Sequence, residues 1–89
     1  MTGAGARWRP NVTVAAVVER DGRYLLVEER ASDGRLVLNN PAGHLDHGET
    51  LLQAVVREVR EATACVFTPT HLQGIHLAPS SADGVTYLR

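Results

Sequence analysis

Two glutamates whose spacing can support metal chemistry lie near the middle of the chain. Glu58 and Glu61 are three positions apart in a segment with helical periodicity, so both carboxylates project from one helix face. Neighbouring carboxylates repel each other unless a cation neutralises them, and oxygen ligands of this kind suit Mg²⁺. A solvated acidic face, aided by Arg57 and Arg60, is the alternative, and the pair taken alone favours it.

The segment that carries these glutamates is the clearest predicted element, a helix from Thr50 to about Ala64. Gly48 precedes it, Glu49 places negative charge at its positive end, and Pro69 prevents a longer continuation. Five apolar side chains fall within a sector of about 140° on a helical wheel and form the predicted core face. These residues are Leu51, Leu52, Val55, Val56 and Val59.

Short apolar and β-branched runs predict five strands around this helix. They cover residues 12–18, 23–29, 35–38, 72–77 and 85–88. Hairpin turns are expected at Asp21-Gly22 and at residues 32–34, and a polar loop at residues 80–84. Residues 39–43 are expected to be irregular, because Pro41 and Gly43 interrupt any regular pattern. This order predicts an α+β fold in which a mixed sheet packs on a helix.

The composition bounds the class of protein. A chain of 89 residues with 44% hydrophobic residues and a net charge of −1 predicts one domain over residues 1–89, with residues 1–9 disordered. The nine basic residues are scattered, which argues against a nucleic-acid partner. No apolar run approaches the roughly 18 residues of a membrane span, so no membrane partner is expected. The single Cys65 excludes an internal disulfide, favours the cytoplasm, and is expected in the core.

The sequence around the glutamates decides between the two interpretations of the pair. Gly43 is followed after five residues by Glu49, and after seven more by Arg57-Glu58-Val59-Arg60-Glu61. This spacing matches the Nudix box, G-x5-E-x7-R-E-U-x-E-E-x-G-U, where U is apolar. The chain therefore resembles the Nudix hydrolases. The resemblance implies a Nudix fold, an α/β/α sandwich with a mixed sheet, and Mg²⁺-dependent hydrolysis of phosphoanhydride bonds in nucleoside di- and triphosphates or related pyrophosphates.

The resemblance also implies a role for each matching residue. Glu58 and Glu61 are the implied catalytic and metal-binding carboxylates. The backbone carbonyl of Ala42 is an implied further ligand of Mg²⁺, for which Mn²⁺ is the alternative. Glu49 and Arg57 are implied to form a salt bridge that holds the loop on the helix.

Three further polar side chains are candidates for contact with substrate. His44 lies in the loop before the helix, and Arg23 and Glu28 belong to the second predicted strand. Charged side chains at strand edges are more often solvated, so that alternative stays open for Arg23 and Glu28.

A narrower similarity links most of the chain to bacterial NudJ-type phosphatases. It rests on residues 10–15, 26–29, 40–45, 75–79 and 87–89. It implies a small phosphorylated substrate, either a nucleotide or a pyrophosphate of thiamine or its pyrimidine precursor. A homo-oligomer is one candidate assembly.

Two positions depart from the box. Ala62 replaces a glutamate that serves as a ligand in the family, and Ala64 replaces the box glycine. Members of the family also extend well beyond Arg89, so the fold is expected to lack its C-terminal part. A catalytically degenerate protein that binds a nucleotide or metabolite, or an inactive fragment, is therefore the alternative to an active hydrolase.

Overall fold

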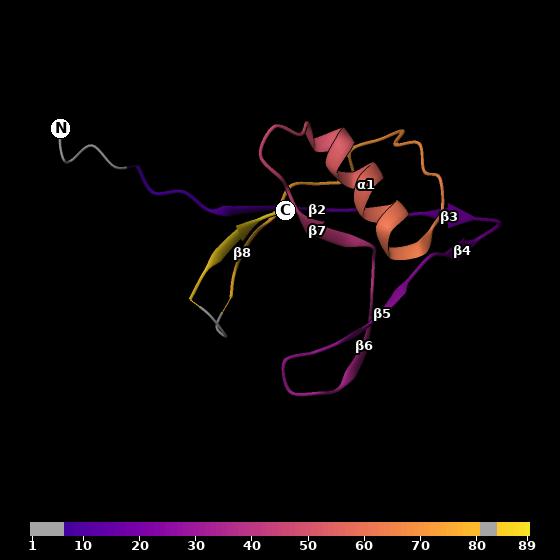
Figure 1. Ribbon diagram of the computed structural model, residues 1–89, viewed down its shortest axis with the longest axis horizontal. Coiled ribbons are helices and arrows are strands. Elements are labelled where there is room, and N and C mark those ends of the chain that lie inside the picture. Colours follow the sequence, from indigo (N-terminus) through magenta and orange to yellow (C-terminus); the bar gives the residue numbers. More distant parts are fainter. Residues whose placement is uncertain (1–6, 81–83) are drawn as a thin grey trace.

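A mixed four-stranded sheet lies against one helix in the computed structural model, which describes residues 7–80 and 84–89 (Figure 1). The strand order is β7-β2-β9-β8, and β2 pairs antiparallel with β7 and parallel with β9. The sheet and helix comprise β2 (Asn11–Ala15), β7 (Ala42–His44), α1 (Leu51–Thr63), β8 (Leu77–Pro79) and β9 (Thr86–Leu88). The predicted α+β class is therefore confirmed.

Two hairpins connect β2 to β7. The first turns at Asp21 and Gly22, whose positive φ angles of 53° and 77° agree with the predicted Asp-Gly turn. The second projects from the sheet at the bottom of Figure 1, and its paired strands carry the chain back to β7. The hairpin strands are β3 (Glu19–Arg20), β4 (Arg23–Tyr24), β5 (Val27–Arg30) and β6 (Leu36–Asn39).

Three predicted strands are longer than the strands of the structure. The strand predicted over residues 12–18 ends at Ala15, and the one predicted over 23–29 is divided between β4 and β5. Of the strand predicted over 72–77, only Leu77 lies in β8. An apolar run becomes a strand only where it meets a pairing partner, so local composition overestimates strand length.

The prediction of an irregular segment at residues 39–43 is wrong for Asn39, the last residue of β6, and for Ala42 and Gly43, which belong to β7. Pro41 is buried just before this strand, and its carbonyl accepts a hydrogen bond from Ala16 N at 2.9 Å. Because β7 is an edge strand, a proline that precedes it removes no ladder bond from the middle of the sheet.

Two predictions reach beyond the part of the chain that the structure describes. Residues 1–6 of the segment predicted to be disordered (1–9) lie outside the described residues. Residues 81–83 of the predicted polar loop also lie outside them. No helix among the described residues is long and apolar enough to cross a membrane.

Helix α1 begins and ends where the sequence predicts. Thr50 is the N-cap: its Oγ1 accepts from Gln53 N at 3.1 Å, while Gln53 Oε1 accepts from Thr50 N at 2.9 Å. This reciprocal capping box satisfies backbone donors that the first helical turn leaves unpaired. Ala64 closes the other end in the left-handed conformation, with φ of 60°, and its N–H donates to Arg60 O at 2.8 Å.

Replacing Ala64 by glycine is expected to stabilise the protein by about 0.5–1 kcal/mol. The left-handed conformation costs an L-residue about 1–2 kcal/mol, and glycine avoids this cost. Glycine also has more conformational freedom in the unfolded chain, which offsets part of the gain. Urea unfolding measures the change. The matched control is Ala62→Gly inside the helix, which is expected to destabilise by about 1 kcal/mol. Equal destabilisation by both variants would contradict the left-handed cap.

The core lies between α1 and the strands β2 and β7, and it is small. Its buried apolar side chains are Val14, Ala16, Ala54 and Val59. The predicted core face is wrong for Leu51 and Leu52, which are 59% and 65% exposed, while Ala54 is fully buried in their place. The small Ala54 side chain allows a close approach between the helix and the sheet.

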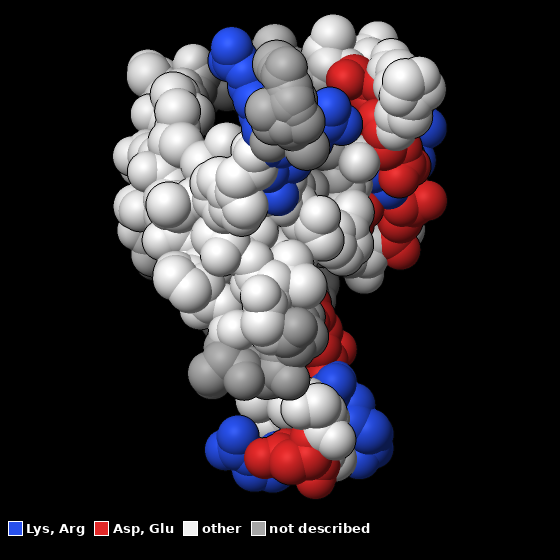
Figure 2. Space-filling view, turned by 90° about the vertical axis from the view of Figure 1, so that its left-hand side faces the viewer, with Lys and Arg blue, Asp and Glu red and all other residues white. Residues whose placement is uncertain are grey.

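Exposure also corrects the prediction for Cys65, which is a free and exposed thiol and not part of the core. Beyond the helix the chain leaves the sheet, and Val66 is 88% exposed. Figure 2 shows a mostly uncharged face, with acidic side chains along one edge and mixed charges on the projecting hairpin.

Candidate metal centre

The open edge of β7 presents backbone carbonyls to the polar side of α1. Carbonyls alternate in direction along an antiparallel strand, and Pro41 O faces β2, where it bonds Ala16 N. The carbonyls of Ala42 and His44, one and three residues after Pro41, therefore both point away from β2. Arg57 Nη2 indeed donates to His44 O at 2.9 Å. The alternation places the Ala42 carbonyl at the edge that the helix side chains reach.

Gly43 allows Glu58 to approach this edge. A Cβ atom at Gly43 would overlap the Glu58 carboxyl group, so only glycine leaves room for that carboxylate against the β7 backbone. The Glu58 side chain is 16% exposed, which shows that it packs on the strand and does not extend into solvent. The box glycine therefore has a steric function here, and its φ is not in the left-handed region.

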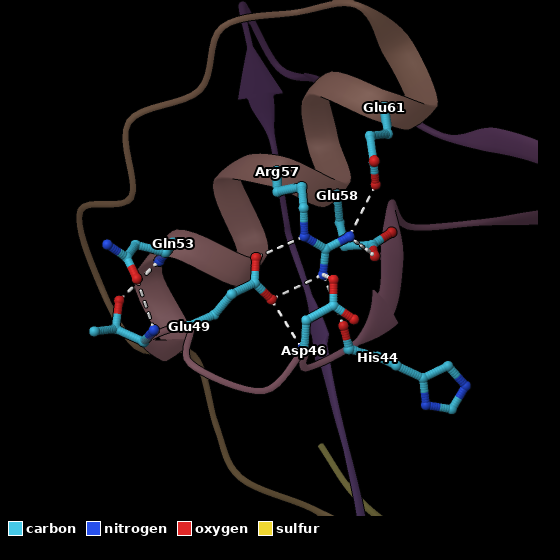
Figure 3. Close-up of polar contacts among 8 residues, drawn as sticks. His44, Asp46, Glu49, Gln53, Arg57, Glu58 and Glu61 are labelled. Atoms are coloured by element: carbon cyan, nitrogen blue, oxygen red, sulfur yellow. Dashed lines mark hydrogen bonds and ion pairs between the residues drawn. The ribbon is translucent and has the colours of Figure 1, made fainter.

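Arg57 fastens the loop before the helix. Its Nε and Nη2 donate to the two carboxylate oxygens of Glu49 at 2.6 and 3.0 Å, and Glu49 also accepts from Asp46 N at 2.9 Å (Figure 3). This bidentate ion pair is the arrangement implied for Glu49 and Arg57. The hydrogen bond from Arg57 lowers the pKa of Glu49. The contribution of the pair to stability is therefore present above the unfolded pKa of Glu49 and is lost as the pH falls through its lowered folded pKa.

The same guanidinium brings Glu58 and Glu61 together. Arg57 Nη1 donates to Glu58 Oε1 at 2.7 Å and to Glu61 Oε1 at 2.8 Å, so the two carboxylates converge on one nitrogen. Hydrogen bonds to Glu49 first, and then to Glu58, raise the pKa of Arg57, which keeps it charged. The guanidinium thus occupies a point where a cation is neutralised by both carboxylates.

The donors at this point fit a hard divalent cation. They are the carboxylates of Glu58 and Glu61 and, at the strand edge, the Ala42 carbonyl, while the 61% exposed side chain of Glu61 leaves room for water. Within residues 7–80 and 84–89, no three His, Cys, Asp or Glu side chains gather as a metal cluster. Mg²⁺ suits such a set, because it is commonly held by one or two carboxylates together with waters and substrate phosphates.

Ala62 lies one helical turn after Glu58 and is exposed. Its methyl group is therefore not part of the buried core. A longer acidic side chain at this position would lie on the Glu58 side of the helix.

A pocket of about 290 Å³ adjoins the strand edge. It is lined by Thr13, Glu29, Asn39, Ala42, Gly43, His44, Tyr87 and Arg89. His44, one of the predicted substrate-binding residues, points its ring away from the Arg57 cluster (Figure 3) and lies 6.2 Å from the ring of Tyr87. Arg23 and Glu28, the other two, do not line the pocket.

Sequence reasoning missed Glu29 and Arg89, which do line it. Successive side chains of a strand point to opposite faces, so Glu28 and Glu29 cannot share one surface, and the sequence does not say which of them faces a site. Arg89 reaches the pocket only because β9 pairs in parallel with β2, a contact between distant parts of the chain.

This fold and site place the chain in a known family. The family model for the NUDIX domain matches residues 7–84, and the chain belongs to the Nudix hydrolase family. Among curated proteins it is 40% identical to the protein named phosphatase NudJ of Escherichia coli strain K12, over 83 residues. The protein of the same name from Shigella flexneri gives the same identity.

Two solved structures have the same fold. A NUDIX hydrolase from Nitrosomonas europaea superposes with a TM-score of 0.86 and 52% sequence identity, and the match covers 91% of this chain and 55% of that one. The solution structure of the E. coli ORF135 protein gives a TM-score of 0.78 at 28% identity, covering 90% and 56% of the two chains. The match to NudJ covers 91% of this chain and 54% of NudJ, so the chain spans about half the length of these relatives.

Proposed function

We propose that the protein is a phosphohydrolase that cleaves phosphoanhydride bonds of small phosphorylated substrates, nucleoside di- and triphosphates or related pyrophosphates, with Mg²⁺ or alternatively Mn²⁺. The observation that carries the proposal is the convergence of Glu58 and Glu61 on Arg57 Nη1 beside the strand edge that bears Ala42. Similarity to proteins named phosphatase supports the reaction class.

The residues divide the work between binding and proton transfer. Glu58, Glu61 and the Ala42 carbonyl would hold the cation, which neutralises phosphate oxygens and makes a bound water more acidic. Glu58 is the best placed to accept a proton from the attacking water, because Gly43 leaves room for its carboxylate at the strand edge. The new bond forms between the water oxygen and phosphorus, and the anhydride P–O bond breaks to release phosphate.

Phosphate release in the presence and absence of metal tests the proposed function. The purified protein is expected to release phosphate from at least one of GTP, ADP and thiamine pyrophosphate in Mg²⁺. Excess EDTA is expected to stop the release, and an excess of Mg²⁺ or Mn²⁺ to restore it. Release that continues unchanged in EDTA, or no release from any of the three, contradicts the proposal.

Ala62 favours a second candidate function, a degenerate protein that binds its nucleotide or metabolite without turning it over. Introducing Ala62→Glu adds a carboxylate one turn from Glu58. We expect the Mg²⁺ concentration for half-maximal phosphate release to fall about tenfold, because the charge of the ligand set controls affinity for hard cations. Val66→Glu, which adds the same charge at an exposed position outside the helix, is the control. Activity that is found only in Ala62→Glu would establish the degenerate alternative.

Two further expectations accompany the proposed function. A homo-oligomer and a cytoplasmic location stay predictions, and sedimentation and cell fractionation test them. The exposed Cys65 agrees with a reducing compartment, because an unpaired surface thiol is readily oxidised elsewhere.

A further inference from the structure

The pocket beside the metal centre has two chemically different walls. One wall comes from the β5–β6 hairpin and carries Glu29 and Asn39. The other comes from β9 and its neighbouring residue and carries Tyr87 and Arg89. Because the chain brings the walls together from separate hairpins across β2, the pocket is a product of the tertiary fold.

The hairpin wall presents a pair of hydrogen-bonding groups. Asn39 Nδ2 donates to Glu29 Oε2 at 3.3 Å, which orients the carboxylate and the amide beside each other on one face of the hairpin. An ionised carboxylate accepts through two oxygens, and an amide nitrogen carries two N–H groups. The wall therefore offers acceptor capacity on Glu29 next to a further N–H donor on Asn39.

The opposite wall combines aromatic surface with positive charge. The rings of His44 and Tyr87 lie 6.2 Å apart with an interplanar angle of 52°. Arg89 is held by its Nε, which donates to the buried Thr13 Oγ1 at 3.1 Å, so its guanidinium is anchored at the pocket. A flat ring and an anionic group of one ligand would both find complementary partners here.

The pocket adjoins the candidate metal centre, because Ala42 and Gly43 line it and also form the strand edge beside Glu58. A substrate with its diphosphate at that edge would place the rest of its structure between the two walls. The volume of about 290 Å³ is near the lower end of the range for small-molecule sites, which suits a single heterocycle.

We propose that this pocket selects substrates whose heterocycle bears an exocyclic amino group, which donates to Glu29 while a neighbouring ring acceptor receives a hydrogen bond from Asn39. The proposal rests on the proposed function for the position of the diphosphate. Cytosine, adenine, guanine and 4-aminopyrimidines share this pattern of a donor beside an acceptor. Uracil and hypoxanthine carry a carbonyl oxygen where cytosine and adenine carry the amine.

Selection follows from the loss of a hydrogen-bond donor to Glu29 when the ring carries a carbonyl oxygen in place of the amino group. A carbonyl oxygen placed against a carboxylate gives two acceptors with no proton between them, and the carboxylate loses water without gaining a partner. A site built to bond a donor therefore rejects an analogue that lacks it more strongly than an apolar pocket would. The pocket is open to solvent, and we expect the discrimination to be about tenfold, the lower end of what a hydrogen bond to a charged group supplies.

The experiment compares CTP with UTP, which differ at this amino group and its ring neighbour. Phosphate release in Mg²⁺ gives kcat/KM for each, and calorimetric titration of a non-hydrolysable analogue of each nucleotide in Mg²⁺ gives Kd without turnover. Wild type is expected to favour CTP about tenfold in both measurements. Glu29→Gln is expected to bring the ratio close to one, because a glutamine amide can accept from an amine or donate to a carbonyl.

Glu28→Gln is the matched control, since it removes the adjacent carboxylate, which does not line the pocket. It is expected to keep the CTP preference. A wild-type ratio near one, or a preference that persists in Glu29→Gln, overturns the proposal. A CTP preference in binding together with no phosphate release from any nucleotide or from thiamine pyrophosphate overturns the proposed function and leaves the selection by Glu29 supported.

Discussion

Replacing Glu58 by glutamine is expected to lower the rate of phosphate release by about 10²–10⁴-fold, the range found when a catalytic proton acceptor is removed. Glutamine keeps the size of the side chain and its place over Gly43, but it loses the charge that the cation and Arg57 both require. Phosphate release from the best substrate in saturating Mg²⁺ measures the change. Urea unfolding should show that the variant remains folded.

The matched control for Glu58→Gln is Glu19→Gln, which removes an exposed carboxylate from β3, a strand outside the candidate metal centre. It is expected to retain the wild-type rate. If the two variants release phosphate at the same rate, Glu58 has no part in the chemistry and the metal centre must be sought elsewhere.

A single methyl group at Gly43 is expected to lower the rate of phosphate release by about 10²-fold. The Cβ of Gly43→Ala would overlap the Glu58 carboxyl group, and that carboxylate must then move away from the strand edge and the Ala42 carbonyl. A displacement of about 1 Å at a catalytic group is sufficient for an effect of this size. Steady-state phosphate release measures the loss, and circular dichroism should show an intact helix.

A double-mutant cycle separates this steric effect from a general loss of structure. Because Gly43 acts through Glu58, the variant that carries both Gly43→Ala and Glu58→Gln should be no slower than Glu58→Gln alone. The shorter Glu58→Asp side chain should recover part of the rate in the Gly43→Ala background. Fully additive losses would show that Gly43 has a separate role.

Local features of the sequence predicted the helix and the ion pair between Glu49 and Arg57. The ends of α1 follow from groups within a few residues of each other, such as the Thr50 and Gln53 side chains, and the spacing of Glu49, Arg57 and Glu58 lies within one loop and one helix. What the box pattern did not explain is why Gly43 is glycine. The reason, contact with Glu58, becomes visible only when the helix is docked on β7.

Features that depend on distant contacts could not be predicted in the same way. The wheel identifies an apolar face, but only the docking of the helix on β2 and β7 shows that Ala54 is buried and Leu51 is exposed. Likewise Glu29 and Arg89 come from two different strand pairings, and nothing within either segment indicates that they face the same pocket.

Arg57 links the position of the loop before α1 to the binding of a cation by Glu58 and Glu61. One guanidinium holds Glu49 and the His44 carbonyl on one side and Glu58 and Glu61 on the other. A cation that drew the latter two carboxylates away would release Arg57 Nη1 and leave the guanidinium to Glu49. By thermodynamic reciprocity, a ligand that tightens the loop then raises the affinity for the cation by the same factor. Arg57, a side chain with a scaffolding role, would thereby couple the binding of a cation to the binding of a ligand at the loop.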